Sequence, residues 1–220
     1  LRGTTLPYVV QEVGPADNDP LVKAQPKFVK YMNQRFCMIN GDTTRKEGVD
    51  EIPNNNKVYF SEAGTSGVLT WNALNFFSSE SSADANISME ISANALWVWG
   101  SNSYEVYQTA SNPDMPYRRI GGASGEIGCQ APHSVATIGG QVFWLGTSKA
   151  GVNQIFMSQG YTPVVISTHA ISYQLSKLGD TSDAVAFCYQ QENHTFYVLT
   201  LVGGNKTFVY DVTEGEWFNQ

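Results

Sequence analysis

Four segments of the chain repeat the same order of short apolar strands and tight turns, and this repetition constrains the fold more than any other feature. The second strand of each unit contains RFCMING, ALWVWGS, QVFWLGT or HTFYVLT, and the third contains KVYFSEA, SYEVYQT, NQIFMSQ or KTFVYDV. Equivalent positions lie about 45–60 residues apart, and four strands per unit at that period are typical of propeller blades.

A four-stranded twisted sheet of this length cannot bury both of its faces alone, whereas packing successive sheets face to face around an axis does so. We therefore predict an all-β, propeller-like fold with at least four four-stranded antiparallel blades. The units span approximately 27–74, 87–120, 134–166 and 184–220, and residues 1–26 add a strand and a loop. Together they form one domain, or a fragment of one, over 1–220. A β-sandwich is the alternative, because sandwiches also show short strands at regular spacing.

The turns and the apolar runs give local expectations. Gly139-Gly140 is a two-residue hairpin signal, and Asn33-Gln34 is the corresponding turn of the first unit. The run VFWLG after Gly139-Gly140 lacks apolar–polar alternation, so we expect both of its faces to be buried. Pro163 is expected on an outer edge strand, where no ladder hydrogen bond is lost.

Two stretches have helical character, TWNALNFF at 70–77 and HAISYQLSKLGD at 169–180. In the second, Ile171, Leu175 and Leu178 lie at helical spacing and Gly179 provides a stop signal. We predict one short helix near 169–178, between the third and fourth units.

Charge and hydropathy exclude two classes of function. Charged residues make up only 15% of the chain, the net charge is −7, and no basic run occurs. A nucleic-acid groove needs clustered Lys and Arg, so we expect no sequence-specific nucleic-acid binding and no affinity dominated by phosphate contacts. No apolar segment approaches the roughly 18–20 residues of a membrane span, so none is expected.

The three cysteines, Cys37, Cys129 and Cys188, are odd in number and widely spaced, which is unlike a disulfide framework. Cys37 and Cys188 lie inside apolar runs and are interpreted as small buried hydrophobic residues.

The histidines offer little for metal binding. Cys129 and His133 form a C-x3-H pair with Glu126 nearby, but structural zinc needs four ligands and no second pair follows. We interpret them as a buried cysteine and a loop histidine. His169 begins the predicted helix and is expected to cap or orient it, and His194, in a polar hairpin turn, is expected to be solvated.

Motifs for catalysis are weak. No G-x-S-x-G elbow occurs, and the Gly-rich stretch at 122–126 lacks the Lys and the strand–helix context of a phosphate loop, so it is interpreted as a simple loop. The D-N-D at 17–19 lacks the rest of a calcium loop and is interpreted as a solvated turn. Asp211 and Trp217 have the spacing of hairpins in kelch-like blades, where the Asp stabilises a turn and the Trp packs between blades. We therefore predict no enzyme, no cofactor, and no catalytic, cofactor-binding or metal residues.

Several phrases together resemble the phage stabilisation protein family, the packaged-DNA stabilisation proteins of short-tailed phages. They are NKVYFSEAG, TWNALNF, ALWVWGSNSYEVYQT, SVATIGGQVFWLG, GYTPVVISTHAI and FYVLT…FVYDV…W, and they cover about 56 to 220. The resemblance implies a structural protein of the virion, made in the host bacterial cytoplasm. It further implies a homo-oligomeric ring in the tail, below the portal and its adaptor, that retains the packaged genome and binds the tail needle and tailspikes.

The alternative is a carbohydrate-binding or glycan-degrading propeller of a phage tail, because the abundant Trp, Tyr and polar loops suit sugar stacking. A glycosidase would need two carboxylates about 5–9.5 Å apart across a cleft.

Overall fold

A computed structural model describes residues 26–40, 56–63, 71–82, 84–147 and 151–219. The predicted strand within residues 1–26 and the turn at 17–19 therefore lie outside the described residues. The first described strand begins at Pro26. The described residues form four separate antiparallel sheets, which we call blades 1 to 4 in chain order.

Each blade is a meander in which consecutive strands pair. Blade 1 contains β1 (Pro26–Met32), β2 (Arg35–Asn40), β3 (Lys57–Ser61) and β4 (Trp71–Ser78). Blade 2 contains β5 (Asn86–Ser92), β6 (Ala95–Gly100), β7 (Tyr104–Thr109) and β8 (Tyr117–Gly125). Blade 3 contains β10 (Ala136–Ile138), β11 (Gln141–Thr147), β12 (Asn153–Gln159) and β13 (Thr162–Val165), with the short β9 (Gly128–Cys129) also paired to β11. Blade 4 contains β14 (Val185–Gln191), β15 (His194–Leu201), β16 (Lys206–Asp211) and β17 (Glu216–Asn219).

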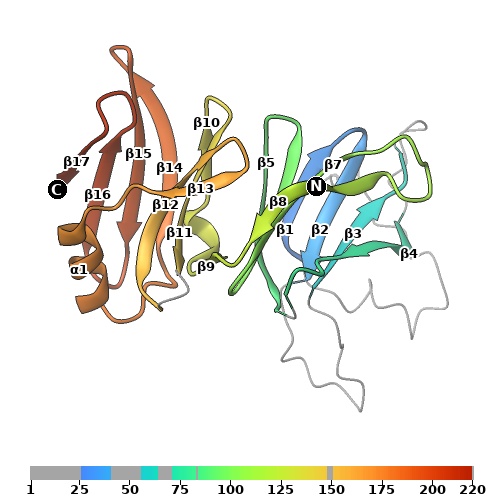
Figure 1. Ribbon diagram of the computed structural model, residues 1–220, viewed down its shortest axis with the longest axis horizontal. Coiled ribbons are helices and arrows are strands. Elements are labelled where there is room, and N and C mark those ends of the chain that lie inside the picture. The colour runs from blue at the N-terminus through green and yellow to red at the C-terminus, as the bar shows by residue number, and fades with distance from the viewer. Residues whose placement is uncertain (1–25, 41–55, 64–70, 83, 148–150, 220) are drawn as a thin grey trace, which may run out of the picture.

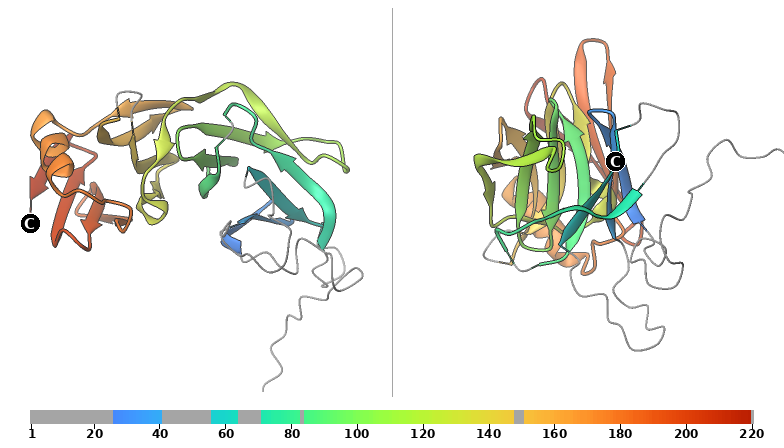
Figure 2. Two further views of the ribbon diagram at one scale, coloured as in Figure 1. Left: turned by 90° about the horizontal axis from the view of Figure 1, so that it is seen from below. Right: turned by 90° about the vertical axis from the view of Figure 1, so that its right-hand side faces the viewer.

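The blades follow one another along an open arc that does not close into a ring (Figures 1 and 2). On the inner side of the arc the first strands meet, β1 with β5, β5 with β10 and β10 with β14. The four-bladed all-β fold is thus confirmed, and the β-sandwich alternative is wrong because the strands form four small sheets rather than two large ones. The predicted second and third strands coincide with β2, β6, β11 and β15 and with β3, β7, β12 and β16.

Two sequence interpretations are corrected. The stretch 70–77, a candidate helix, is strand β4, because Phe76 and Phe77 pair in register with β3. The stretch 122–126 was interpreted as a simple loop, but its residues 122–125 are the end of β8, whose pairing with β7 continues to Gly125 opposite Tyr104. In both cases pairing with a neighbouring strand outweighs the local composition, which alone does not favour a strand.

All four hairpins between first and second strands use the same turn. Both central residues have positive φ in each of the pairs Asn33-Gln34, Ala93-Asn94, Gly139-Gly140 and Glu192-Asn193. This is the type I′ geometry, whose twist matches that of the flanking strands. The turns at Asn33-Gln34 and Gly139-Gly140 were predicted from the sequence and are confirmed.

Three hydrophobic clusters fill the spaces between successive blades. The cluster between blades 1 and 2 includes Cys37, Ile39, Phe60, Leu96 and Val98. The cluster between blades 2 and 3 includes Trp97, Trp99, Val142, Trp144 and Phe156. The cluster between blades 3 and 4 includes Phe143, Leu145, Tyr197, Leu199 and Phe208. Strand β11 contributes to two of these clusters, which confirms that both faces of VFWLG are buried. Pro163 lies on the edge strand β13, as predicted.

Helix α1 (His169–Lys177) lies between blades 3 and 4 in sequence and confirms the predicted helix. Its N-cap is Thr168, whose Oγ1 accepts a hydrogen bond from the Ile171 amide at 3.3 Å. Ile171 and Leu175 are buried in the cluster between blades 3 and 4, and Gly179, with φ of 71°, follows the helix end. His169 is the first helical residue rather than the cap.

Candidate functional site

The first strand of blade 3 is interrupted, and the interruption forms a hub on the inner side of the arc. Between β9 and β10 lies the 3-10 helix η1 (Pro132–Ser134). The Ser134 hydroxyl donates to the Ala131 carbonyl at 2.7 Å and accepts from the Leu145 amide at 3.0 Å. The Ser134 carbonyl accepts from the Tyr197 hydroxyl of blade 4 at 2.9 Å. The hub therefore ties blade 4 to blade 3 through hydrogen bonds rather than through apolar packing alone.

The hub also reaches the first two blades. The Ser88 hydroxyl of β5 donates to the Pro132 carbonyl at 2.9 Å, and the His133 ring lies 5.3 Å from the ring of Phe28 in β1, centroid to centroid. Nearby, the Lys30 ammonium of β1 and the Glu90 carboxylate of β5 form an ion pair at 2.6 Å. Residues 132–134 thus contact all four blades.

Cys129 and His133 each have contacts of their own. The Cys129 thiol donates to the Ala131 carbonyl at 3.1 Å, and burial raises its pKa to about 12, although hydrogen bonds to Ser134 and Ala131 act in the opposite direction. His133 is exposed and faces Phe28. Within the described ranges, no group of three or more His, Cys, Asp and Glu side chains is placed to hold a metal ion.

Asp211 and Trp217 fix the end of blade 4. The Asp211 carboxylate accepts hydrogen bonds from the amides of Thr213 at 2.8 Å and Glu214 at 3.3 Å, so it stabilises the turn as predicted. The Trp217 indole N–H donates to the Ile166 carbonyl at 2.8 Å, and its ring packs on the cluster between blades 3 and 4, as predicted.

His194 is placed differently from the expectation. It is the first residue of β15, and its Nδ1 lies 2.6 Å from Oδ2 of the buried Asp211. Burial opposes ionisation of the Asp211 carboxyl, but the hydrogen bonds from His194, Glu214 and Thr213 outweigh it and hold its pKa below its ordinary value. The pair could not be predicted from local sequence, because the two residues are 17 positions apart and meet only through the pairing of β15 with β16.

A depression of about 390 Å³ lies near the outer strands of blades 1 and 2. It bears on the glycosidase alternative because carboxylates and aromatic side chains line it together. Its lining includes two carboxylates, Glu80 and Glu105, and the aromatic side chains of Phe76, Phe77 and Tyr107. Glu105 is only 1% exposed. Its oxygens accept from the Tyr107 hydroxyl and the Ser81 amide, each at 2.5 Å.

These contacts make Glu105 an anchor for the segment between blades 1 and 2. The Arg119 guanidinium lies 3.6 Å from its Oε2. Burial, and next the hydrogen bond to Glu105, raise the pKa of Tyr107 well above its ordinary value, so the phenol remains a donor. A catalytic carboxyl must reach its substrate, and Glu105 is instead covered and engaged by its own chain.

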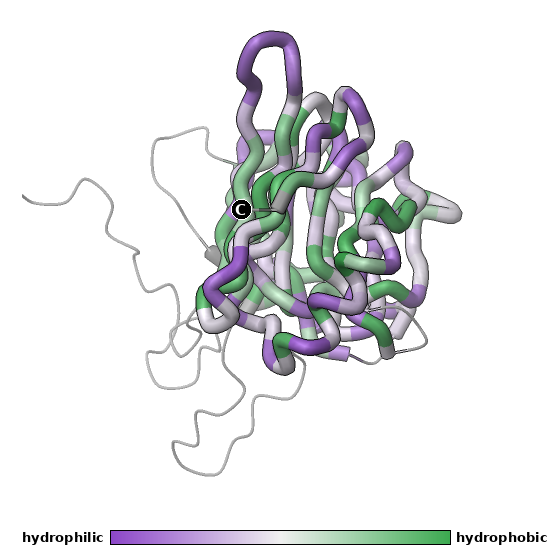
Figure 3. The backbone as a smooth tube through the Cα atoms, turned by 90° about the vertical axis from the view of Figure 1, so that its left-hand side faces the viewer, coloured by the Kyte–Doolittle hydropathy of each residue, from purple (hydrophilic) through white to green (hydrophobic). Residues whose placement is uncertain are grey.

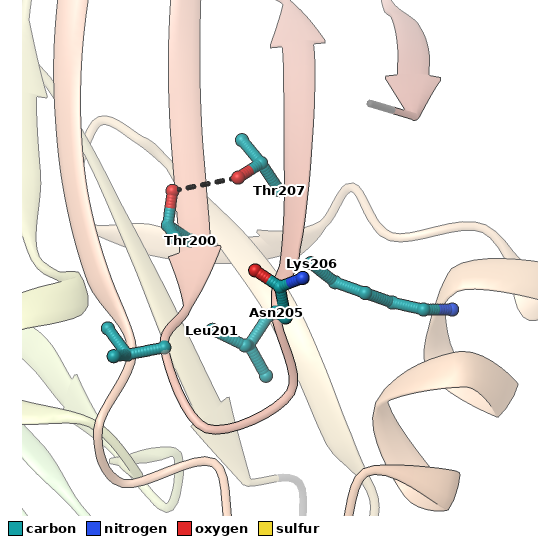
Figure 4. Close-up of a pocket in the computed structure, with 6 residues that line it drawn as sticks. Thr200, Leu201, Asn205, Lys206 and Thr207 are labelled. Carbon is teal, nitrogen blue, oxygen red and sulfur yellow. Dashed lines mark hydrogen bonds between the residues drawn. The ribbon is translucent and has the colours of Figure 1, made fainter.

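A second depression, of about 410 Å³, lies at the β15–β16 hairpin. Figure 4 shows Thr200 and Thr207 facing each other, with 3.1 Å between their Oγ1 atoms. Lys206 points away toward α1, where its Nζ donates to Gln174 Oε1 at 3.1 Å. The lining residues include two threonine hydroxyls and Lys206 but no carboxylate, histidine or cysteine that could activate a hydroxyl as a nucleophile.

The β14–β15 hairpin is the most prominent projection of the described chain (Figures 1 and 2). Its tip consists of exposed polar residues, Gln190, Gln191, Glu192 and Asn193. Hairpin tips on a rigid sheet scaffold are places where proteins commonly make contacts.

Among the described residues, no helix has the length and apolar character that a membrane-spanning helix requires.

Two solved structures show weak similarity to the chain. A puromycin-hydrolyzing peptidase of Mycobacterium tuberculosis shares 9% identity and a TM-score of 0.47, with 84% of this chain and 27% of that chain covered. A putative exported protein of Bacteroides fragilis shares 10% identity and a TM-score of 0.28, with 87% of this chain and 70% of that chain covered. The chain thus spans about a quarter of the peptidase, and neither similarity bears on function. A search of curated proteins finds no match.

A family model described as Bacteriophage P22 Gp10, beta-propeller, matches residues 29–219. The match extends over all four blades, and its description agrees with the meander sheets of the fold. The chain therefore belongs to this phage stabilisation family, and it is a structural protein of the phage virion.

Proposed function

We propose that the protein is a component of the tail of a short-tailed phage, where it closes the channel below the portal and retains the packaged genome. In this role it forms a homo-oligomeric ring, contacts the portal or adaptor ring, and binds the tail needle and tailspikes. It is made in the cytoplasm of the host bacterium. The family match over residues 29–219 is the observation that carries the proposal.

The internal organisation of the chain supports a scaffold rather than a catalyst. The buried polar groups Glu105, Ser134 and Asp211 are each engaged by hydrogen bonds that join blades or close turns. The net charge of −7 disfavours a tight grip on phosphates, but a plug can hold DNA by completing an assembly that closes the channel. The projecting β14–β15 hairpin provides a surface for contacts with other tail proteins.

The experiment is to produce phage particles without this protein and to measure how much packaged DNA becomes accessible to nuclease. Such particles are expected to lose their DNA, and addition of the protein before nuclease treatment is expected to prevent the loss. Electron microscopy of intact particles is expected to place the protein in the tail. Full DNA retention without the protein would contradict genome retention, and density elsewhere in the virion would contradict the tail location.

A matched pair of charge reversals tests the hairpin. Glu192→Lys at the tip of the β14–β15 hairpin is expected to weaken incorporation into particles. Asp114→Lys, in the exposed loop between β7 and β8 of blade 2, makes the same charge change away from the projection and serves as the control. Equal incorporation of both variants would show that the hairpin is not a contact surface.

A further inference from the structure

The depression of about 390 Å³ between blades 1 and 2 has the size and the mixed lining of a small-ligand site. Its walls come from β4 and the residues that follow it, from β7, and from β8 with the loop before it, so both blades contribute (Figure 1). Ligand sites commonly have volumes of about 300–1,000 Å³ and combine apolar walls with a few polar groups. We call this site the β4–β8 depression.

The floor of the β4–β8 depression is held in place from both blades. Phe77 of β4 and Tyr107 of β7 are 7% and 4% exposed, and their ring centroids lie 4.4 Å apart. The Tyr107 hydroxyl donates to Glu105 Oε2 at 2.5 Å and lies 3.3 Å from the Ser78 carbonyl oxygen of blade 1. Because these contacts already fix the floor, a ligand does not have to order it on binding.

The apolar surface that a ligand can reach is small. Met115, in the loop before β8, is 43% exposed. Phe76 is half-buried, and the Lys57 ammonium lies 3.9 Å from its ring centroid, so a cation of the chain itself already occupies one face of this ring. The apolar contact therefore suits one ring rather than an extended hydrophobic ligand.

Two charged groups of opposite sign in the lining have unused hydrogen-bonding capacity. Glu80 is exposed, and its carboxylate makes no ion pair or hydrogen bond with the rest of the described chain. The Arg119 guanidinium is 46% exposed and lies 3.6 Å from Glu105 Oε2, and among the described residues it donates no hydrogen bond. The depression thus offers a free acceptor set on Glu80 and a free donor fork on Arg119.

We propose that the β4–β8 depression binds a neutral saccharide ring without cleaving it. A sugar hydroxyl both donates and accepts, so neighbouring hydroxyls satisfy Glu80 and Arg119 together, while the C–H face of the ring packs on Met115. A negatively charged ligand meets the like charge of Glu80 and Glu105, and a positively charged ligand meets that of Arg119. Hydrolysis needs two working carboxyl groups, and Glu105 is covered by its own chain.

The inference rests on the β4–β8 depression alone and not on a role in the phage tail. It is tested by titrating the isotope-labelled chain with glucose, galactose and mannose and following backbone amide signals by NMR. At least one of these sugars is expected to shift the signals of residues around the depression and to saturate with a dissociation constant on the order of 1–10 mM, since a single ring makes few contacts. The sugar is expected to be recovered unchanged.

A charge series on the same ring separates the possible ligand classes. The amino sugar and the uronate that match the best neutral sugar in configuration are each expected to bind several-fold more weakly. Tighter binding of the uronate would overturn the proposal in favour of an anion site at Arg119. Tighter binding of the amino sugar would overturn it in favour of a cation site at Glu80.

Two substitutions locate the binding. Glu80→Ala removes the acceptor set, and Arg119→Lys removes the planar fork while it keeps a positive charge beside Glu105. Each is expected to weaken binding of the neutral sugar about tenfold, with the midpoint of thermal unfolding unchanged. The control is Glu192→Ala, at the hydrophilic tip of the β14–β15 hairpin (Figure 3), which is expected to bind like the unchanged chain.

Two further results would overturn the proposal. One is a titration in which no neutral sugar saturates the signals around the depression at tens of millimolar. The other is sugar binding that Glu80→Ala and Arg119→Lys leave unaltered, because the ligand would then lie elsewhere on the molecule. Loss of genome retention in the particle experiment leaves these outcomes untouched, so the two proposals fail or stand separately.

Discussion

At the scale of single residues, the four type I′ turns hold different residue types in the same positive-φ backbone conformation. Gly139-Gly140 places glycines where φ is positive, at 59° and 81°. Ala93, with φ of 49°, and Glu192, also at 49°, hold the equivalent position with a side chain. A Cβ atom in this region costs about 1–2 kcal/mol, and the hydrogen-bonded ladder between the two strands that the turn connects holds the turn in this conformation. The turn is thus set by the sheet as well as by its own residues.

Reciprocal substitutions measure this local strain. Gly139→Ala is expected to lower the free energy of unfolding by about 1–2 kcal/mol, and Ala93→Gly to raise it by about 0.5–1 kcal/mol. A Cβ at Gly139 would meet no atom within 4 Å, so the change acts through the backbone alone. Urea unfolding gives both values. A loss of stability in Ala93→Gly would show that the turn is not strained.

Trp144 tests the packing between blades 2 and 3. Its side chain is fully buried and lies 5.5 Å from the rings of Trp99 and Phe156, centroid to centroid. Trp144→Ala is expected to lower the free energy of unfolding by about 3–5 kcal/mol, because it leaves a large cavity in a packed core. The exposed Tyr173 of α1 is the control, since Tyr173→Ala is expected to have little effect in the same denaturant titration.

At the scale of elements, strand pairing brings together groups that are distant in sequence. The β15–β16 pairing places His194 next to Asp211, and the β7–β8 pairing extends through a glycine-rich stretch. The strand β4 shows the same effect, since its composition is compatible with a helix and its pairing with β3 decides the outcome.

The Asp211 contacts predict a dependence of stability on pH. The pKa of Asp211 lies below its ordinary 3.8 in the folded chain, so the unfolded chain binds this proton at a higher pH than the folded chain does. The stabilising contribution is therefore complete above about pH 5 and is lost as pH falls through the folded value.

Asp211→Asn removes this titration. Unfolding free energies measured from about pH 6 down to about pH 2 are expected to fall more steeply for the unchanged chain than for the variant. The other carboxylates titrate in both proteins and cancel in the difference. Parallel curves would mean that the ionised carboxylate does not stabilise the folded state.

At the scale of the whole molecule, the arc is held together on its inner side by residues 132–134 as well as by the three apolar clusters. The Tyr197 hydroxyl is the direct link between this hub and blade 4. Burial raises the pKa of Tyr197 well above its ordinary value, so the hydroxyl remains a donor throughout the accessible pH range.

Tyr197→Phe is expected to lower the free energy of unfolding by about 1–2 kcal/mol, because the Ser134 carbonyl loses a buried donor while the ring packing is kept. Tyr189→Phe, in β14 and outside the hub, is the control and is expected to be near neutral. Thermal unfolding of the two variants compares them directly, and equal values would contradict a specific role for the hub.

Much of the fold could be predicted because the repeat is written in local patterns. Apolar strands, two-residue turns and one amphipathic stretch at 169–178 are properties of neighbouring residues, and the structure reproduces them. The interpretation of Asp211 and Trp217 was also accessible, because their spacing within one hairpin is local. The absence of catalytic, cofactor and metal residues stays a prediction, as does the single domain over 1–220.

The rest required tertiary structure. Three features join segments that are 17 or more positions apart in the sequence. They are the contact of Ser88 with the hub at residues 132–134, the His194–Asp211 pair, and the hydrogen bond of Ser81 to the buried Glu105. No local pattern encodes such meetings, since they depend on how distant strands pair and on how one sheet lies against the next. By itself, the sequence determined the repeated unit and its turns, because period and residue size act over a few neighbouring residues. Only the tertiary structure decided which faces of the blades meet, because burial is a property of the whole packed molecule.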